Sequence, residues 1–205
     1  MAKGKKRKTP VVKSRSGKPK RPGPVKPGRA RVKVPAKNPI LPARLLAYLE
    51  KAGVSHSVLV HKTVYTAYDA AATMKKKLDE IAKSLLVKAD KDYYVAILPA
   101  DRNLDMKKLG AVIGKACDRK VKMIKIPGEE IMAEVVKAKN MAITAFGGLH
   151  NLPVVAEKNL EKAKKLVFSS GQHNHSIEMK LKDFLKLEKP ILGKFGIKKK
   201  LAKLK

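Results

Sequence analysis

The chain has 205 residues, and its 44% hydrophobic content is enough for one folded domain with an appendage. Its 48 Lys and Arg against 17 Asp and Glu give a formal net charge of +31, which indicates a polyanionic partner such as a nucleic acid. The sequence excludes an intramolecular disulfide, because Cys117 is the only cysteine, and it holds no apolar run of membrane-spanning length. We therefore expect a cytoplasmic protein with no membrane partner.

Residues 1–40 are expected to form a disordered basic tail. They hold fifteen Lys or Arg, seven Pro and no acidic residue, so they cannot offset their ordering entropy by burying apolar surface. The tail has no aromatic residue for base stacking, which favours phosphate binding without sequence preference. The alternative is a solubilising tail with no dedicated partner. The candidate phosphate-binding residues are Lys5, Lys6, Arg7, Lys8, Lys18, Lys20 and Arg21.

The folded part is expected to span residues 41–195. Its first half begins with a predicted helix over 42–52, which Gly53 ends. A short strand is expected over 57–61. Thr66 with Asp69 three residues later predicts the start of a helix that continues to Met74. The apolar runs 81–87 and 93–98, joined by a turn-rich connection, predict a hairpin.

The second half alternates helices and strands. Helices are expected over 104–115, over 127–136 and around 183–185. Strands are expected over 120–124, 141–144, 152–156, 166–169 and 176–181. This interleaving predicts a mixed α/β domain with a mixed, partly closed sheet and surrounding helices. Residues 196–205 are predicted to form a second basic extension.

Lys83 and two glycine-bearing loops are the best candidates for a functional site. Lys83 stands at the mouth of a buried strand, and the loops are Phe146–His150 and Ser169–His173. An ammonium group tethered to an apolar strand is held in place, and glycine lets backbone N–H groups approach a ligand closely. The set predicts a pocket for an anionic or carbonyl-bearing ligand.

Four segments in one order and spacing resemble the YbaK/EbsC family, which are stand-alone relatives of the editing domain inserted in bacterial prolyl-tRNA synthetases. The segments are 81–88, 94–101, 152–157 and 167–179. The similarity runs from about Ala43 to Phe195. It implies a YbaK-like editing domain that hydrolyses the ester of a misattached amino acid on mischarged tRNA, with no cofactor.

The resemblance also implies roles for single residues. Lys83 would be the catalytic or substrate-placing amine, and the backbone N–H of Gly147 would help to form an oxyanion hole. The ribose hydroxyl of the substrate can assist the water, so no Ser-His-Asp set is required. The residues implied to bind the substrate are Ser84, Phe146, Gly148, Ser169, Ser170, Gly171 and His173.

The sequence departs from the family before Phe146, where residues 140–145 lack the usual glycine and prolines. Methionine or alanine there narrows the pocket or removes backbone freedom. This favours an alternative function, a catalytically weakened YbaK-fold protein that binds RNA or DNA. A protein that coats DNA and merely carries this domain is a third possibility.

A metal site is not expected. His173 and His175 face the same side of a strand, but no third ligand lies at useful spacing. His173 is better interpreted as a polar residue at the rim of the pocket. Cys117, among Lys115, Arg119 and Lys120, is interpreted as a residue at a helix end, because no base is indicated beside it.

Overall fold

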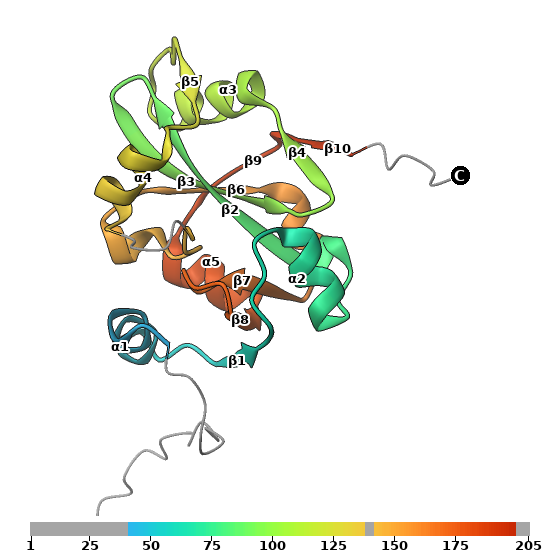
Figure 1. Ribbon diagram of the computed structural model, residues 1–205. Coiled ribbons are helices and arrows are strands. Elements are labelled where there is room, and N and C mark those ends of the chain that lie inside the picture. The colour runs from blue at the N-terminus through green and yellow to red at the C-terminus, as the bar shows by residue number, and fades with distance from the viewer. Residues whose placement is uncertain (1–40, 138–141, 200–205) are drawn as a thin grey trace, which may run out of the picture. The chain divides into compact units, whose positions relative to one another are not determined.

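A mixed sheet organises the folded part (Figure 1), for which the computed structural model describes residues 41–137 and 142–199. The predicted tail, residues 1–40, lies outside the described residues, as do 138–141 and 200–205. Within the described part the sheet has eight strands, and a separate two-stranded sheet pairs β4 (Arg102–Leu104) with β10 (Gly196–Lys198). In sheet order the seven consecutive strands are β1 (His56–Val60), β8 (His175–Lys180), β7 (Lys165–Ser169), β2 (Ile81–Ala89), β3 (Asp92–Pro99), β6 (Val154–Glu157) and β9 (Ile191–Gly193), and β5 (Ile124–Lys125) pairs with β2.

The sheet is mixed because three of its pairings are parallel. β2 runs parallel to β7, β3 to β6 and β6 to β9, whereas the β1–β8, β7–β8, β2–β3 and β2–β5 pairs are antiparallel. The predicted mixed α/β fold is thus confirmed.

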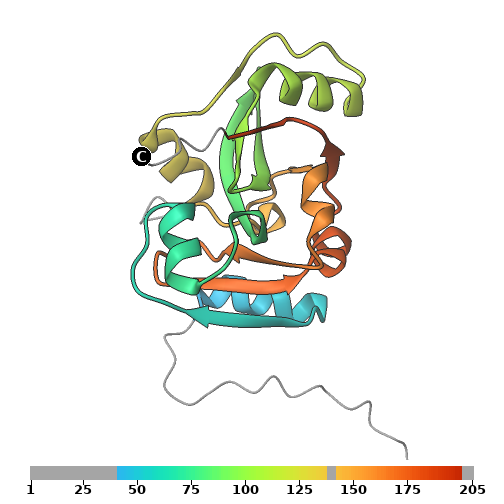
Figure 2. The ribbon, with the colours of Figure 1, turned by 90° about the vertical axis from the view of Figure 1, so that its right-hand side faces the viewer.

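Helices cover both faces of the sheet. Five α-helices and three short 3-10 helices are described: α1 (Ala43–Ala52), α2 (Ala67–Met74), α3 (Met106–Ala116), α4 (Glu129–Val136), α5 (Leu181–Glu188), η1 (Leu78–Glu80), η2 (Gly147–His150) and η3 (Lys158–Lys162). Leu45 of α1 and Phe184 of α5 share one buried cluster, and Ala71 of α2 belongs to another with Ile81 and Val167. Figure 2 shows α1 and α2 on opposite faces of the β1–β8 edge. No helix of the described residues has the length and apolarity to span a membrane.

Local signals in the sequence account for several elements. Gly53 ends α1 with a φ of 63°. Thr66 and Asp69 form the predicted capping box at the start of α2. The predicted hairpin is confirmed, since β2 and β3 pair without interruption from Ala82 opposite Pro99 to Ala89 opposite Asp92.

Two predicted strands are wrong in the described residues. The strand expected over 120–124 is reduced to Ile124–Lys125, because the Asp90 carboxylate accepts the backbone N–H groups of Lys122 and Met123 that a longer ladder would use. Residues 142–144 form no strand either. The Thr144 hydroxyl oxygen accepts the Phe146 N–H there, which favours a local turn over a ladder.

Three short strands were not predicted: β4, β9 and β10. Glu157, a fully buried carboxylate, accepts the backbone N–H groups of Phe195 and Gly196 at the start of β10. These bonds fix the chain after β9 so that β10 can pair with β4. The segment predicted to be a basic extension therefore begins with β10.

Candidate active site

A cavity opens where β2 and β7 separate. These parallel strands pair at only two positions, Ile81 opposite Val167 and Ala82 opposite Phe168. The next residues, Lys83 and Ser84 on β2 and Ser169 on β7, line a cavity of about 380 Å³. The other walls come from α2, from α4 and from the segment after β1. The sequence-predicted Lys83, Ser84, Ser169 and His173 are thus brought together.

The amine of Lys83 is held at this cavity. Its Nζ donates a hydrogen bond of 2.9 Å to the carbonyl oxygen of Arg102. Since an ammonium group has three hydrogens, two others remain for a ligand. Burial lowers the pKa of Lys83 from its ordinary value, and the positive charge of Lys199 lowers it further.

The edge of β2 that faces the cavity carries polar backbone groups. The carbonyl of Ile81 accepts from the N–H of Ala100 beyond β3, and the N–H of Asp90 donates to Met123 on the opposite side. Alternate residues of an antiparallel strand bond to opposite sides, so the peptide groups of Ser84 and Leu86 point away from β3 towards the gap. The Ser84 hydroxyl is buried and has no hydrogen-bond partner within the described part of the chain.

The second glycine-bearing loop, 169–173, shapes the rim of the cavity. Ser169 and His173 line it. Ser170 is buried and donates to the carbonyl of His175 at 2.8 Å, so its hydroxyl holds the loop together. Gly171 adopts a φ of 88°, which disfavours any side chain, and its N–H donates to Ser169 Oγ.

The first glycine-bearing loop is not part of the cavity wall. Phe146 is fully buried and packs on Phe168 and Phe184 in the core. A Cβ atom on Gly147 would lie 2.6 Å from the Leu152 carbonyl oxygen, so this glycine permits close packing of two chain segments. The structure therefore does not bring Gly147, predicted as an oxyanion donor, to Lys83.

Gly148 is occupied in the same way. Its N–H donates to Glu188 Oε2 at 2.9 Å, and the Tyr48 hydroxyl donates to Glu188 Oε1 at 2.8 Å. Burial raises the pKa of the Glu188 carboxyl, while these donors oppose the rise. Burial and the neighbouring Glu188 also raise the pKa of Tyr48 above its ordinary value. Gly148 thus donates to a structural carboxylate.

Sequence reasoning missed three cavity residues: His61, Tyr65 and Ser176. His61 Nε2 lies 2.9 Å from Ser176 Oγ. Tyr65 is 78% exposed, and its ring lies against that of His173 with centroids 4.9 Å apart. Ser176 lies directly opposite Ser169 in the β7–β8 pair, a register that the sequence alone does not give. Across the described residues no group of three or more His, Cys, Asp or Glu is arranged to hold a metal ion.

Residues 61–187 match the family model of the aminoacyl-tRNA editing domain. The chain belongs to this family. The match includes every described residue that lines the cavity, from His61 to Ser176. The predicted family, and with it the predicted class of enzyme, an aminoacyl-tRNA editing hydrolase, is therefore confirmed.

Individual relatives agree with this assignment. The multifunctional Ser/Thr-tRNA deacylase ProXp-y of Escherichia coli strain K12 is 27% identical over 165 residues, which cover 78% of this chain and 95% of that protein. Among solved structures, a protein proposed as a trans-editing enzyme for prolyl tRNA synthetase superposes with a TM-score of 0.65 at 20% sequence identity. The match covers 75% of the present chain and 95% of that protein. The hypothetical protein APE2540 has the same fold, with a TM-score of 0.65 at 16% identity and coverage of 75% and 99%.

Proposed function

We propose that this protein is a trans-acting deacylase that hydrolyses the ester of a misattached amino acid on tRNA. The observation that carries the proposal is the cavity between β2 and β7. It presents a held amine, Lys83, together with Ser169 and Ser176, within the segment that matches the editing-domain family.

The cavity can stabilise the negative charge that develops on an ester carbonyl under attack by water. The Lys83 ammonium, oriented by the Arg102 carbonyl, has two further N–H groups for that oxygen. One well-aimed donor contributes on the order of 3 kcal/mol to the transition state. The ester C–O bond then breaks, and the ribose oxygen of the tRNA leaves with a proton. The backbone of Ser84 and Leu86 supplies further polar groups.

Tyr65 and His173 supply a platform for the terminal adenosine. Both rings line the cavity, and the exposed Tyr65 ring is tilted 47° from that of His173. Nucleic-acid bases stack on such exposed aromatic rings, each contributing about 1–3 kcal/mol. Tyr65→Ala should therefore weaken binding of an aminoacylated tRNA without unfolding the domain.

The amino acid removed is proposed to be serine or threonine. The E. coli relative carries this specificity in its name. Three serines, Ser84, Ser169 and Ser176, are among the residues that line the cavity and suit a substrate with its own hydroxyl group. A site that hydrogen-bonds a hydroxyl rejects analogues without it far better than an apolar pocket rejects one methylene.

The basic tail is proposed to add RNA affinity that does not depend on sequence, and it could engage other nucleic acids in the same way. The seven candidate cations between Lys5 and Arg21 would each neutralise a phosphate and release a counterion. Deleting residues 1–40 should weaken tRNA binding and flatten the plot of log affinity against log salt. An unchanged slope would contradict this role.

The test of the proposed function is deacylation of tRNA charged with serine or threonine, alongside alanine, cysteine and proline esters. Lys83→Ala should slow the reaction by about 10²–10³-fold. Lys91→Ala, an exposed lysine in the β2–β3 turn, is the matched control and should change nothing.

An RNA-binding protein with weakened turnover is the second candidate. The side chains of Ala142 and Ile143 line the cavity in the segment that lacks the family's glycine, which favours this candidate. If the protein binds tRNA tightly but hydrolyses none of the aminoacyl-tRNAs tested, this second candidate is supported over the deacylase.

A further inference from the structure

His61 and Ser176 form an oriented pair on the cavity wall. His61 Nδ1 lies 2.8 Å from the carbonyl oxygen of Lys62. A carbonyl can only accept, so Nδ1 must carry the hydrogen, and Nε2 of the neutral ring is then an acceptor. Its partner at 2.9 Å is Ser176 Oγ, which therefore donates its hydroxyl proton to His61.

This arrangement fixes the polarity of Ser176. Its only proton is directed at His61, so the lone pairs of Oγ are what it can offer to a ligand in the cavity. The Ser176 side chain belongs to a residue that is 7% exposed, and the hydrogen bond between residues 115 positions apart keeps it in place. The pair thus presents an acceptor and no donor.

Sheet order places this acceptor and Lys83 at the two ends of one row across the cavity. Ser176 on β8 lies opposite Ser169 on β7, and β7 is the neighbour of β2, which carries Lys83 (Figure 1). β2 and β7 part after Ala82 and Phe168, so the cavity lies between Lys83 and the strands that carry Ser169 and Ser176, and all three residues line it. One end offers N–H donors and the other an acceptor.

An α-amino ester has the complementary polarity. Its cationic ammonium group lies roughly 3 Å from its carbonyl oxygen, by ordinary bond lengths. The carbonyl oxygen of such an ester can accept from Lys83, while its ammonium group can donate to Ser176. We propose that Ser176, oriented by His61, recognises the α-ammonium group of the aminoacyl ester while Lys83 holds its carbonyl oxygen. This proposal rests on the deacylase function above.

The test compares an aminoacyl-tRNA with its N-acetylated twin, which lacks the ammonium charge. The wild-type chain should prefer the free amine, and Ser176→Ala should lower kcat/KM for it by about 10- to 100-fold, the range for a hydrogen bond to a charged group. The same variant should leave kcat/KM for the N-acetylated substrate nearly unchanged. The selectivity ratio, which is kcat/KM for the free amine divided by kcat/KM for its N-acetylated twin, should therefore fall towards one. Equal losses on both substrates would overturn the proposal.

His61 variants separate orientation from base catalysis. In His61→Gln the side-chain amide oxygen can still accept the Ser176 proton, so the selectivity ratio should survive; in His61→Phe it should fall as in Ser176→Ala. A ratio that survives in both variants would contradict the role of His61. Binding of a non-hydrolysable amide-linked aminoacyl adenosine, against its N-acetyl twin, gives the same comparison without turnover. Failure of the deacylase proposal therefore leaves this one testable.

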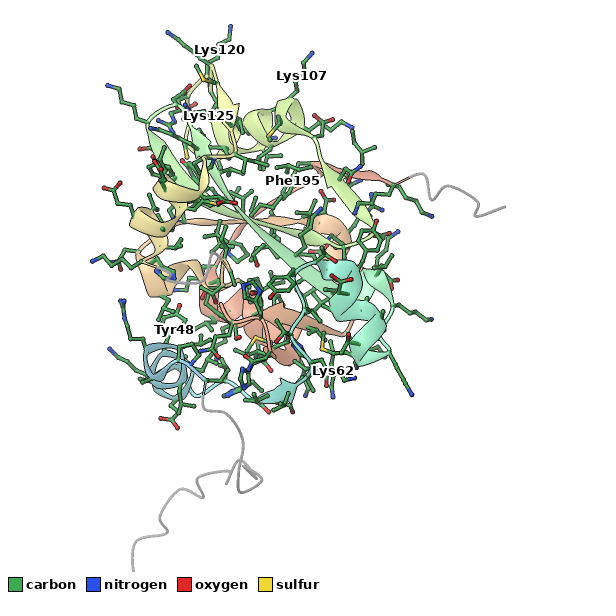
Figure 3. All side chains as sticks on the ribbon, in the orientation of Figure 1. Tyr48, Lys62, Lys107, Lys120, Lys125 and Phe195 are labelled. Atoms are coloured by element: carbon green, nitrogen blue, oxygen red, sulfur yellow. The ribbon has the colours of Figure 1, made fainter. Side chains whose placement is uncertain are left out.

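A second, independent feature is a basic groove between α3 and the segment 119–125. Its volume is about 570 Å³. Five of the residues that line it are cationic: Lys107, Lys115, Arg119, Lys120 and Lys122. Lys125 lies beside it on β5, and Figure 3 shows Lys107 and Lys120 projecting from this end of the domain. All six side chains belong to exposed residues.

Most of this charge is uncompensated. Among the described residues, Arg119 is the one member of the set that forms an ion pair, with Asp92 at 2.5 Å. One segment joins the two sites, since Ile124 lines the groove and Ile126, two residues on, lines the cavity. We infer that the groove binds phosphates of the tRNA strand beyond its acylated end.

The groove is tested in the full chain with Lys107, Lys120 and Lys125 replaced by alanine. The slope of log tRNA affinity against log salt should fall by about 2–3, because each lost phosphate contact removes about 0.7–0.9. Replacing Lys51, Lys158 and Lys162, exposed lysines on α1 and η3, removes the same charge and is the control. Equal changes in both triple variants would overturn the inference, and binding reports on it even without ester hydrolysis.

Discussion

The two glycine-bearing loops of this domain look alike in sequence and do different work. Phe146–His150 turns inward: Phe146 is in the core, Gly147 packs against the Leu152 carbonyl and Gly148 donates to Glu188. Ser169–His173 faces the cavity, and Gly171 is needed there for its positive φ. A glycine near a site therefore has two separate uses, close packing and unusual backbone conformation, and only the second shapes the pocket here.

Gly147→Ala should have the largest effect on stability. The added Cβ would lie 2.5 Å from Val154 Cγ2 and 2.6 Å from the Leu152 carbonyl oxygen, and the backbone cannot move aside cheaply. We expect the free energy of unfolding to fall by about 3 kcal/mol, as measured by urea denaturation. Gly128→Ala, where a Cβ meets nothing within 4 Å, is the control. A stable Gly147→Ala protein with abolished deacylation would instead make this loop catalytic.

Tyr48→Phe tests whether Glu188 anchors the first loop. The substitution removes the hydroxyl that donates to Glu188 and leaves a largely buried carboxylate with one donor fewer. A loss of about 2 kcal/mol in unfolding free energy is expected. Tyr65→Phe removes a hydroxyl from an exposed ring and should leave the unfolding midpoint unchanged. Equal unfolding midpoints for the two variants would contradict the anchoring role.

Gly171→Ala should affect activity more than stability. At a φ of 88° a Cβ costs about 1 kcal/mol, but the nearest atoms are 3.6 Å away, so the loop can adjust. The adjustment moves Ser169, whose hydroxyl accepts the Gly171 N–H at the cavity. Deacylation per folded molecule should drop measurably while the melting temperature changes little. A lower melting temperature with unchanged deacylation would show that Gly171, like Gly147, serves packing and not the cavity.

The smallest predicted effect concerns pH. Burial and Lys199 lower the pKa of Lys83, and the charged amine is the form that holds the carbonyl oxygen. The rate, corrected for spontaneous ester hydrolysis, should therefore fall as pH rises through this lowered pKa. In Lys83→Arg the guanidinium stays charged, so the remaining activity should not show that fall. The same alkaline fall in both proteins would exclude Lys83 as its source.

Local patterns explain which parts of the fold could be predicted. The Thr66–Asp69 cap and the β2–β3 hairpin each depend on residues close in sequence, and both were predicted. The strand over 120–124 was overestimated because Asp90, some thirty residues earlier, takes its N–H groups. A contact between residues that far apart produces no pattern of apolar residues in a single sequence, so it could not be predicted.

The same distinction holds for the candidate site. Lys83 was predicted because it stands at the mouth of an apolar strand, and Ser169 because it follows one and precedes Gly171; the structure places both at the cavity. His61 and Ser176 were missed because their pairing depends on the order β1–β8–β7, which no local signal encodes. The wrong location for Gly147 had a related cause, since only the distant Leu152 and Val154 reveal its packing role.

The last strand of the domain is linked to the amine of Lys83. β10 pairs with β4, and Arg102 on β4 both bonds to the Gly196 carbonyl and offers its own carbonyl to Lys83. Lys199, just beyond β10, adds a repulsive charge to the same amine. A shortened chain that stops before Gly196 would thus lose the strand that pairs with β4 and the charge of Lys199 together, and the pKa of Lys83 would then be lowered by burial alone.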